Sequence, residues 1–219
     1  MLMQLGTACQ SFRTLDVVKH TNPCGVASRH DILEAYRLAV KADPVSAFGG
    51  IVAFNMEVDE AHAKETREFR SPIDGETRMF HEIVAAPKYK KKGLEILRGK
   101  SKTSRILEAK SNEKGKLSLR QDGAGWLAQD SDDLTPQDIQ FKVMSDKGPI
   151  GSELHDAEFA WLCVKHVKSN AVVIAKVCTL MNLRLENSQP LTHSKEFSPL
   201  SLFGQNNCMG TFKTLYLIL

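Results

Sequence analysis

The sequence predicts an α/β fold in which strands and helices alternate along the chain. Short apolar runs typical of buried strands occur at residues 51–54, 82–86 and 171–175. Segments with helical apolar spacing lie between such runs, and turn residues separate them. A chain of 219 residues with 42% apolar content is long enough to bury a real core, so an alternating α/β order is favoured.

The first predicted strand ends on Lys19 and His20. Asn22, Pro23 and Gly25 follow at once, and they predict a turn straight into a helix start. An imidazole beside an ammonium group suits proton transfer near neutral pH. Two interpretations remain open for this pair, namely a catalytic pair and a surface lysine next to a histidine at the core edge.

The next helix is predicted from Asp31 to about Ala42, from apolar residues at helical spacing and acidic residues in its first turn. The segment 43–50, Asp-Pro-Val-Ser-Ala-Phe-Gly-Gly, leads into a strand at 51–54. Its glycine pair would let the backbone approach a ligand closely, and it fits a plain tight turn equally well.

The remaining elements are predicted from the same signals. In chain order they are a helix from Asp59 to about Phe69, a strand at 82–86, a basic helix at 89–98, a strand at 104–108, short antiparallel strands at 116–121, 123–126 and 139–143, a helix capped by Ser152, and a strand at 171–175.

Composition excludes several classes of protein. A net charge of +3 is too small to indicate a nucleic-acid partner, and the basic cluster at 88–102 is explained by a solvated helix face. Five scattered cysteines without Cys-x-x-Cys spacing indicate a reducing compartment. No apolar run is long enough for a membrane span and no signal peptide is recognisable, so we expect a cytoplasmic protein without a membrane partner.

Five motifs in order carry a resemblance to a known family. They are Lys-His-Thr-Asn-Pro-Cys-Gly at 19–25, Asp-Pro-Val-Ser-Ala-Phe-Gly-Gly-Ile-Val-Ala at 43–53, Glu-Ile-Val-Ala-Ala-Pro at 82–87, Trp-Leu-Ala-Gln at 126–129 and Phe-Ala-Trp-Leu-Cys-Val-Lys-His-Val-Lys-Ser-Asn-Ala at 159–171. Residues 16–176 resemble the AICAR transformylase domain of the bifunctional purine biosynthesis protein.

The resemblance implies cytidine-deaminase-like three-layer α/β units and a homodimer. It divides the chain into an unstructured edge at 1–15, a first unit at 16–110, a β-rich connector at 111–150 and the start of an incomplete second unit at 151–176. An aberrant tail at 177–219 would follow.

The implied reaction is transfer of a formyl group from 10-formyl-tetrahydrofolate, the co-substrate, to the 5-amino group of AICAR on the route to IMP. By motif, His20 would accept the proton of the attacking amine. Lys19 would stabilise the transition state and protonate the departing folate nitrogen. Asn170 would hydrogen-bond the formyl oxygen and the carboxamide, although a helix cap is an alternative role for it.

The resemblance also implies the substrate contacts. Phe48 and Gly49 would line the AICAR site, and Glu82 would bind the polar edge of the nucleotide. A salt bridge at the strand end is the alternative role for Glu82.

No catalytic metal is expected. Zinc deaminases carry Pro-Cys-x-x-Cys, whereas Pro23-Cys24 is followed here by Gly-Val-Ala, so the second thiolate is missing. Cys24 is therefore expected to be a small buried packing residue. The alternative of a deaminase-like hydrolase would require bound zinc.

The family pattern is expected to stop after Lys176. Residues 177–205 open on Val and close on Gln, as the codons of a retained intron would, and a Gln205 codon other than CAG would refute this. The tail would then lack stable packing, and the second half and the cyclohydrolase domain would be absent. The alternative function is a non-catalytic fragment that at most dimerises with a full-length subunit.

Overall fold

A computed structural model describes residues 13–99, 103–109, 117–132, 134, 138, 141–144, 146, 148–167, 171–176, 179–184 and 216–218. The helices are α2 (Ile32–Ala42), α3 (Pro44–Ala47), α4 (Glu60–Glu68), α5 (Lys91–Arg98) and α6 (Gly151–Val164). The strands are β1 (Arg13–Lys19), β2 (Asn22–Arg29), β3 (Gly50–Phe54), β4 (His81–Ala86), β5 (Arg105–Glu108), β6 (Leu117–Asp122), β7 (Gly125–Asp130), β8 (Ala171–Lys176), β9 (Thr179–Arg184) and β10 (Tyr216–Ile218).

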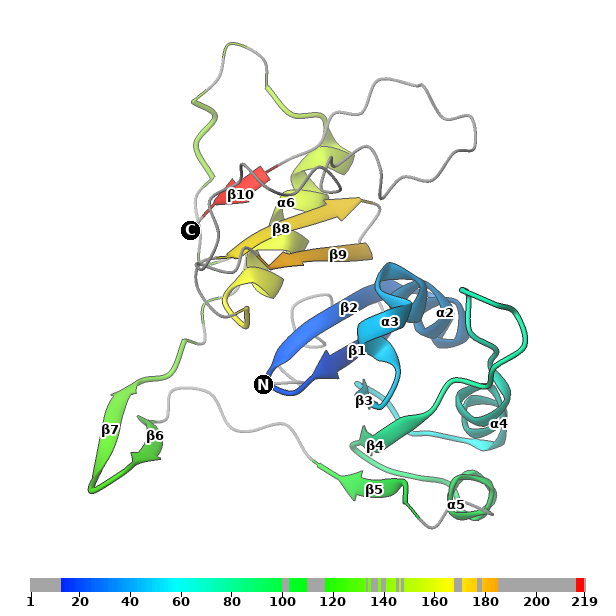
Figure 1. The fold of residues 1–219 in the computed structure, drawn as a ribbon. Helices are drawn as coiled ribbons and strands as arrows, with labels where there is room; N and C mark the ends of the chain where they lie inside the picture. The colour runs from blue at the N-terminus through cyan, green and yellow to red at the C-terminus, as the bar shows by residue number, and fades with distance from the viewer. Residues whose placement is uncertain are drawn as a thin grey trace, which may run out of the picture.

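Most of the described strands form one mixed sheet, in the order β10-β8-β9-β2-β1-β3-β4-β5 (Figure 1). Strand β1 runs antiparallel to both of its neighbours, β2 and β3, whereas β3, β4 and β5 run parallel to one another. The β6-β7 hairpin stands apart from this sheet. The expectation of an α/β fold is confirmed.

The sheet is covered on both faces. On one face, side chains of α2 and α4 pack against β1, β2, β3 and β4 around the fully buried Leu15, Val17 and Tyr36. On the other face, α6 packs with Val26 of β2 and with Val173 and Ala175 of β8. A strand buried on both faces reads as a continuous apolar run, which explains the residues of β3.

Most of the predicted elements are confirmed. These are the helices now labelled α2, α4 and α5, the strands β3, β4, β5 and β8, and the antiparallel pair β6-β7. Asp31 caps α2 by accepting from the Leu33 amide at 3.0 Å, and Asp59 caps α4 in the same way through Ala61 at 3.0 Å. None of the helices in the described segments is long and apolar enough to cross a membrane.

The expected helix start after His20 is wrong. Residues 22–29 form strand β2 instead, with Val18 opposite Pro23 at an irregularity in the β1-β2 ladder. The helix begins only at Ile32. Gly25 lies within β2 and not in a turn. A Cβ built on it would lie 1.9 Å from the backbone oxygen of Ala39 in α2. The glycine is explained by close packing of helix on strand.

Other boundaries also need correction. Residues 13–15 belong to β1, so the predicted unstructured edge at 1–15 ends too late, and residues 1–12 lie outside the described residues. Ile150, not Ser152, is the N-cap of α6. Residues 141–143 are not a strand, and 139–140 are outside the description.

The prediction that the chain beyond Val177 lacks stable packing is wrong for β9. This strand pairs with β8 on one side and with β2 on the other, so the first and last thirds of the chain share one sheet. Arg29 also donates to the side chain of Thr179 at 2.8 Å. The edge of β8 is likewise paired with β10. The retained-intron hypothesis stays a prediction.

Asp16 is a buried carboxyl group in the middle of β1. It is 2% exposed, and its Oδ1 has no hydrogen-bond partner within the described residues. Loss of hydration raises the pKa of Asp16 to about 8, because burial penalises the charged form. The folded chain therefore holds this proton more tightly than the unfolded chain.

Replacing Gly25 by Ala should destabilise the fold, because the added methyl group collides with the backbone of α2. Overpacking typically costs about 1–3 kcal/mol in the free energy of unfolding, which urea denaturation would measure. Gly125→Ala is the matched control, since nothing lies within 4 Å of its would-be Cβ. Equal stability of the two variants would contradict the described packing of α2 on β2.

Asp16→Asn should stabilise the chain at pH 7 and leave it nearly unchanged at pH 4. The pKa of Asp16 is about 8 in the folded chain and 3.8 in the unfolded chain, so the free energy of unfolding falls as pH rises between these values. The loss amounts to about 4 kcal/mol at pH 7. Denaturation at both pH values measures the difference. Asp122→Asn, in the exposed hairpin, should change little at either pH, and an Asp16→Asn variant no more stable than the parent at pH 7 would refute this account.

Candidate functional site

The turn between β1 and β2 carries the predicted catalytic pair. Lys19 pairs with Asn22, so His20 and Thr21 form a two-residue turn between the strands. His20 is exposed and has φ 55°, the left-handed conformation that non-glycine residues rarely adopt. Such conformations cost about 1–3 kcal/mol and cluster at functional sites, and here the turn presents the imidazole to solvent.

The segment 43–50 lies next to this turn. Asp43 accepts from the Ser46 amide at 3.0 Å and so caps the short helix α3, which has Pro44 in its first turn. Gly49 then takes φ 68°, and a Cβ on Gly50 would lie 3.0 Å from the backbone oxygens of Ala47 and Val18, which is tighter than most Cβ contacts. The positive φ favours glycine at position 49, and the close backbone approach favours it at position 50.

A hydrogen bond joins the two segments. The ammonium group of Lys19 donates to the backbone carbonyl of Phe48 at 2.8 Å. A Cβ on Gly49 would lie 3.3 Å from the same ammonium nitrogen. The structure thus brings together three of the predicted site residues, Lys19, Phe48 and Gly49, with His20 adjacent in the chain.

The turn at Phe48 is also held by the start of β4. The Gly49 amide donates to the carbonyl of Phe80 at 2.7 Å, and the rings of Phe48 and Phe80 lie 6.1 Å apart. Phe48 remains 45% exposed, so its ring is available to contact a planar ligand.

Two buried polar residues next to this turn were missed by sequence reasoning. Tyr36 of α2 and His81 of β4 approach to 2.8 Å through the Tyr36 hydroxyl and Nε2 of His81. Burial lowers the pKa of His81 to about 4, so the ring is neutral at pH 7. The available signal was a histidine at the first position of an apolar strand. The predicted strand began at residue 82 and so did not include His81.

Two predicted site residues are not brought to the turn by the described contacts. Glu82 is exposed and pairs with Arg105 of β5 at 3.0 Å, which is the strand-end salt bridge left open as its alternative role. Asn170 lies outside the described residues. Nucleotide binding by Glu82 and the role of Asn170 stay predictions.

Cys24 lies in the core below the turn. Its thiol donates to the carbonyl of Val17 at 3.3 Å. Burial and the Asp43 carboxylate raise the pKa of the thiol to about 12, so it is protonated at pH 7 and is a packing residue as expected. Within the described ranges, no three His, Cys, Asp or Glu side chains lie close enough together to hold a metal ion.

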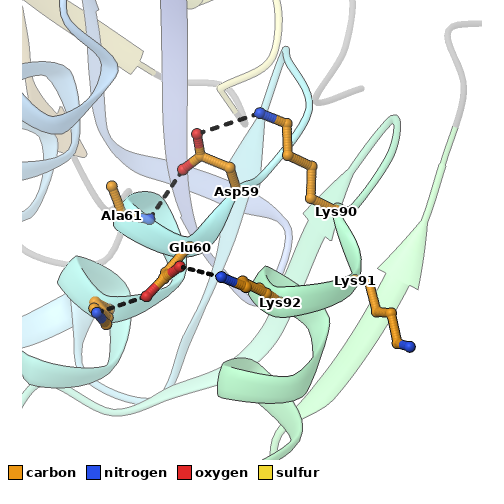
Figure 2. A pocket seen from close by; sticks show the side chains of 7 residues that line it. Asp59, Glu60, Ala61, Lys90, Lys91 and Lys92 are labelled. Carbon is orange, nitrogen blue, oxygen red and sulfur yellow. Dashed lines mark hydrogen bonds and ion pairs between the residues drawn. The ribbon is translucent and has the colours of Figure 1, made fainter.

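A surface hollow elsewhere holds the predicted basic cluster. It is lined by Asp59, Glu60, Ala61, Lys64, Lys90, Lys91 and Lys92 (Figure 2). Lys90 pairs with Asp59 at 3.7 Å, and Glu60 pairs with Lys64 at 2.8 Å and with Lys92 at 3.8 Å. Three of the four lysines are paired with the two carboxylates, and the hollow, which keeps a net positive charge, is a solvated face of α4 and α5.

Known proteins match most of the chain. The sequence profile described as AICARFT/IMPCHase bienzyme matches residues 4–183 and so extends past Lys176, where the family pattern was expected to stop. A bifunctional purine biosynthesis protein PurH from Thermoanaerobacter sp. (strain X514) is 43% identical over 159 residues, covering 73% of this chain and 29% of that protein. Its counterpart in Microcystis aeruginosa (strain NIES-843 / IAM M-2473) is 39% identical over 167 residues, covering 76% and 31%.

A third relative gives the same picture. PurH of Bacillus cereus (strain G9842) is 41% identical over 163 residues, covering 73% of this chain and 29% of the relative. The chain therefore spans less than a third of the length of these curated relatives. With a profile match over residues 4–183, the chain belongs to the AICARFT/IMPCHase bienzyme family.

Proposed function

We propose that the chain carries part of the AICAR formyltransferase site of IMP biosynthesis, with 10-formyl-tetrahydrofolate as co-substrate. The observation that carries the proposal is the 2.8 Å hydrogen bond from Lys19 to the Phe48 carbonyl, which joins the two segments with the strongest family motifs. The family match supports the same assignment.

The chemistry requires removal of a proton from a weak nucleophile. The 5-amino nitrogen of AICAR attacks the formyl carbon, and the bond from that carbon to the folate nitrogen breaks. His20, exposed on its turn, takes the proton that the amine loses, and the Lys19 ammonium donates a proton to the departing nitrogen. The positive charge of Lys19 also stabilises the developing oxyanion, a role that Asn170 is proposed to share.

The neighbouring segment binds the nucleotide in this proposal. The exposed ring of Phe48 and the glycine backbone that follows it would contact the imidazole carboxamide. Glu82 would reach the polar edge of the nucleotide only by leaving Arg105, because the two are paired at 3.0 Å. Phosphate and folate contacts lie with the rest of the family's chain.

A cytidine-deaminase-like fold belongs to the same proposal. The strand order β2-β1-β3-β4-β5, with β1 antiparallel to its neighbours and the last three strands parallel, supports it. The β8-β9 hairpin would begin the second unit. The homodimer and the cytoplasmic location stay predictions.

A non-catalytic segment that pairs with a full-length subunit stays the alternative to the enzyme proposal. Strands β9 and β10 provide sheet pairing for β8 within this chain, and that supports folding of the segment by itself.

The enzyme proposal predicts the kinetics of a chimaera in which residues 16–176 replace the matching segment of the Thermoanaerobacter relative. His20→Ala should lower kcat for formyl transfer by about 10² to 10⁴, because the amine then loses its proton to solvent. Lys19→Ala should lower kcat by about 10² to 10³, because transition-state charge is left unstabilised. Consumption of 10-formyl-tetrahydrofolate is the measurement.

Lys92→Ala and His155→Ala are the matched controls, since both side chains are exposed, at 79% and 74%, and neither contacts the turn. Both should leave kcat within about twofold. If the parent chimaera is active and its His20→Ala variant has a kcat within tenfold of the parent value, the assignment of the catalytic pair is refuted.

The second candidate predicts mixed dimers. Co-expression of the chain with the full-length Thermoanaerobacter relative, followed by size-exclusion chromatography, should give a species of one long and one short subunit. Formyl transfer by the isolated chain at a rate comparable to the relative would instead exclude the non-catalytic reading.

A further inference from the structure

A buried pair, Tyr36 and His81, lies between the hydrophobic core and the turn that binds Lys19. Tyr36 is 1% exposed and His81 is 4% exposed, and the hydroxyl and Nε2 are 2.8 Å apart. Burial lowers the pKa of His81 and raises that of Tyr36, so both are neutral at pH 7. Either group can be the donor, because the direction of this hydrogen bond depends on the tautomer of His81.

His81 is joined to the 47–49 turn through the backbone. It lies opposite Gly50 in the pairing of β3 with β4. The residue before it, Phe80, accepts from the Gly49 amide through its carbonyl at 2.7 Å. The start of β4 thus contacts this turn directly after Phe48.

We propose that Tyr36 and His81 are positioning residues that hold the Phe48 carbonyl, and through it the Lys19 ammonium, in place. Lys19 has a flexible four-carbon side chain, and its hydrogen bond to the Phe48 carbonyl fixes the ammonium only if that carbonyl is itself fixed. Tyr36 is anchored by edge-on packing against Phe69, with ring centroids 5.4 Å apart. The inference deepens the proposed function and rests on it for its consequence in catalysis.

The test uses the whole chain without nucleotide, so its result does not depend on whether the chain transfers formyl groups. Hydrogen exchange of the Lys19 ammonium is followed by NMR on ¹⁵N-lysine-labelled protein. The Lys19 signal is the one that disappears from the spectrum of the Lys19→Arg variant. Tyr36→Phe removes one hydroxyl and keeps the ring. It should speed exchange at Lys19 about fivefold, the factor that corresponds to about 1 kcal/mol, the typical net worth of one hydrogen bond.

Tyr89→Phe is the matched control. Its hydroxyl donates to the carbonyls of Val84 in β4 at 2.8 Å and of Leu107 in β5 at 3.0 Å, so the variant loses tyrosine hydrogen bonds to β4 and β5, away from the turn. Exchange at Lys19 should stay within about twofold of the parent. A role of Tyr36 in overall stability alone would affect both variants alike.

A pair of variants at position 81 makes the test independent of Tyr36→Phe folding. His81→Gln retains a side-chain hydrogen-bond partner for Tyr36 and should behave as the parent, whereas His81→Leu should speed exchange as Tyr36→Phe does. The proposal is overturned if Tyr36→Phe speeds hydrogen exchange of the Lys19 ammonium no more than Tyr89→Phe does. It is also overturned if His81→Gln and His81→Leu speed this exchange equally. Failure of the chimaera to transfer formyl groups would refute the proposed function and leave this result standing.

Discussion

The hydrogen bond from Lys19 to the Phe48 carbonyl is the contact on which the arrangement of the site depends. It joins a strand end to a turn that lies 29 residues further along the chain. The contact is possible because β1 and β3 are paired directly, with Val18 opposite Ile51. Antiparallel pairing of these two strands brings the end of one beside the beginning of the other, so the ammonium and the turn must meet.

The same constraint explains the residues around the contact. Gly49 adopts a positive φ and Gly50 lies against two backbone oxygens, so the close passage of this segment beside Val18 favours glycine at both positions. His20 takes a strained left-handed conformation because only two residues connect β1 to β2. Strain in an exposed histidine beside a fixed ammonium is consistent with selection for a site.

The sequence predicted much of the fold because α2, α4, β3 and β4 follow clean periodicity with capping residues in place. It failed at Pro23 and Gly25, where local turn preferences indicate a helix start but pairing with β1 and the packing of α2 impose a strand. β9 was missed because the chain after Lys176 was expected to lack stable packing, whereas β9 forms a hairpin with β8 and also pairs with the distant β2. The Lys-His pair was found from its position at a strand end, whereas no local pattern predicts the contact of Tyr36 with His81, since it spans 45 residues.

A crystal structure of the chain with AICAR bound would test the central claim most directly. The account predicts the imidazole carboxamide against Phe48 and Gly49, with the 5-amino nitrogen within hydrogen-bond distance of His20 and with Lys19 still bound to the Phe48 carbonyl. The nucleotide bound at the hollow formed by Lys64, Lys90 and Lys92, with the turn at 47–49 empty, would contradict it.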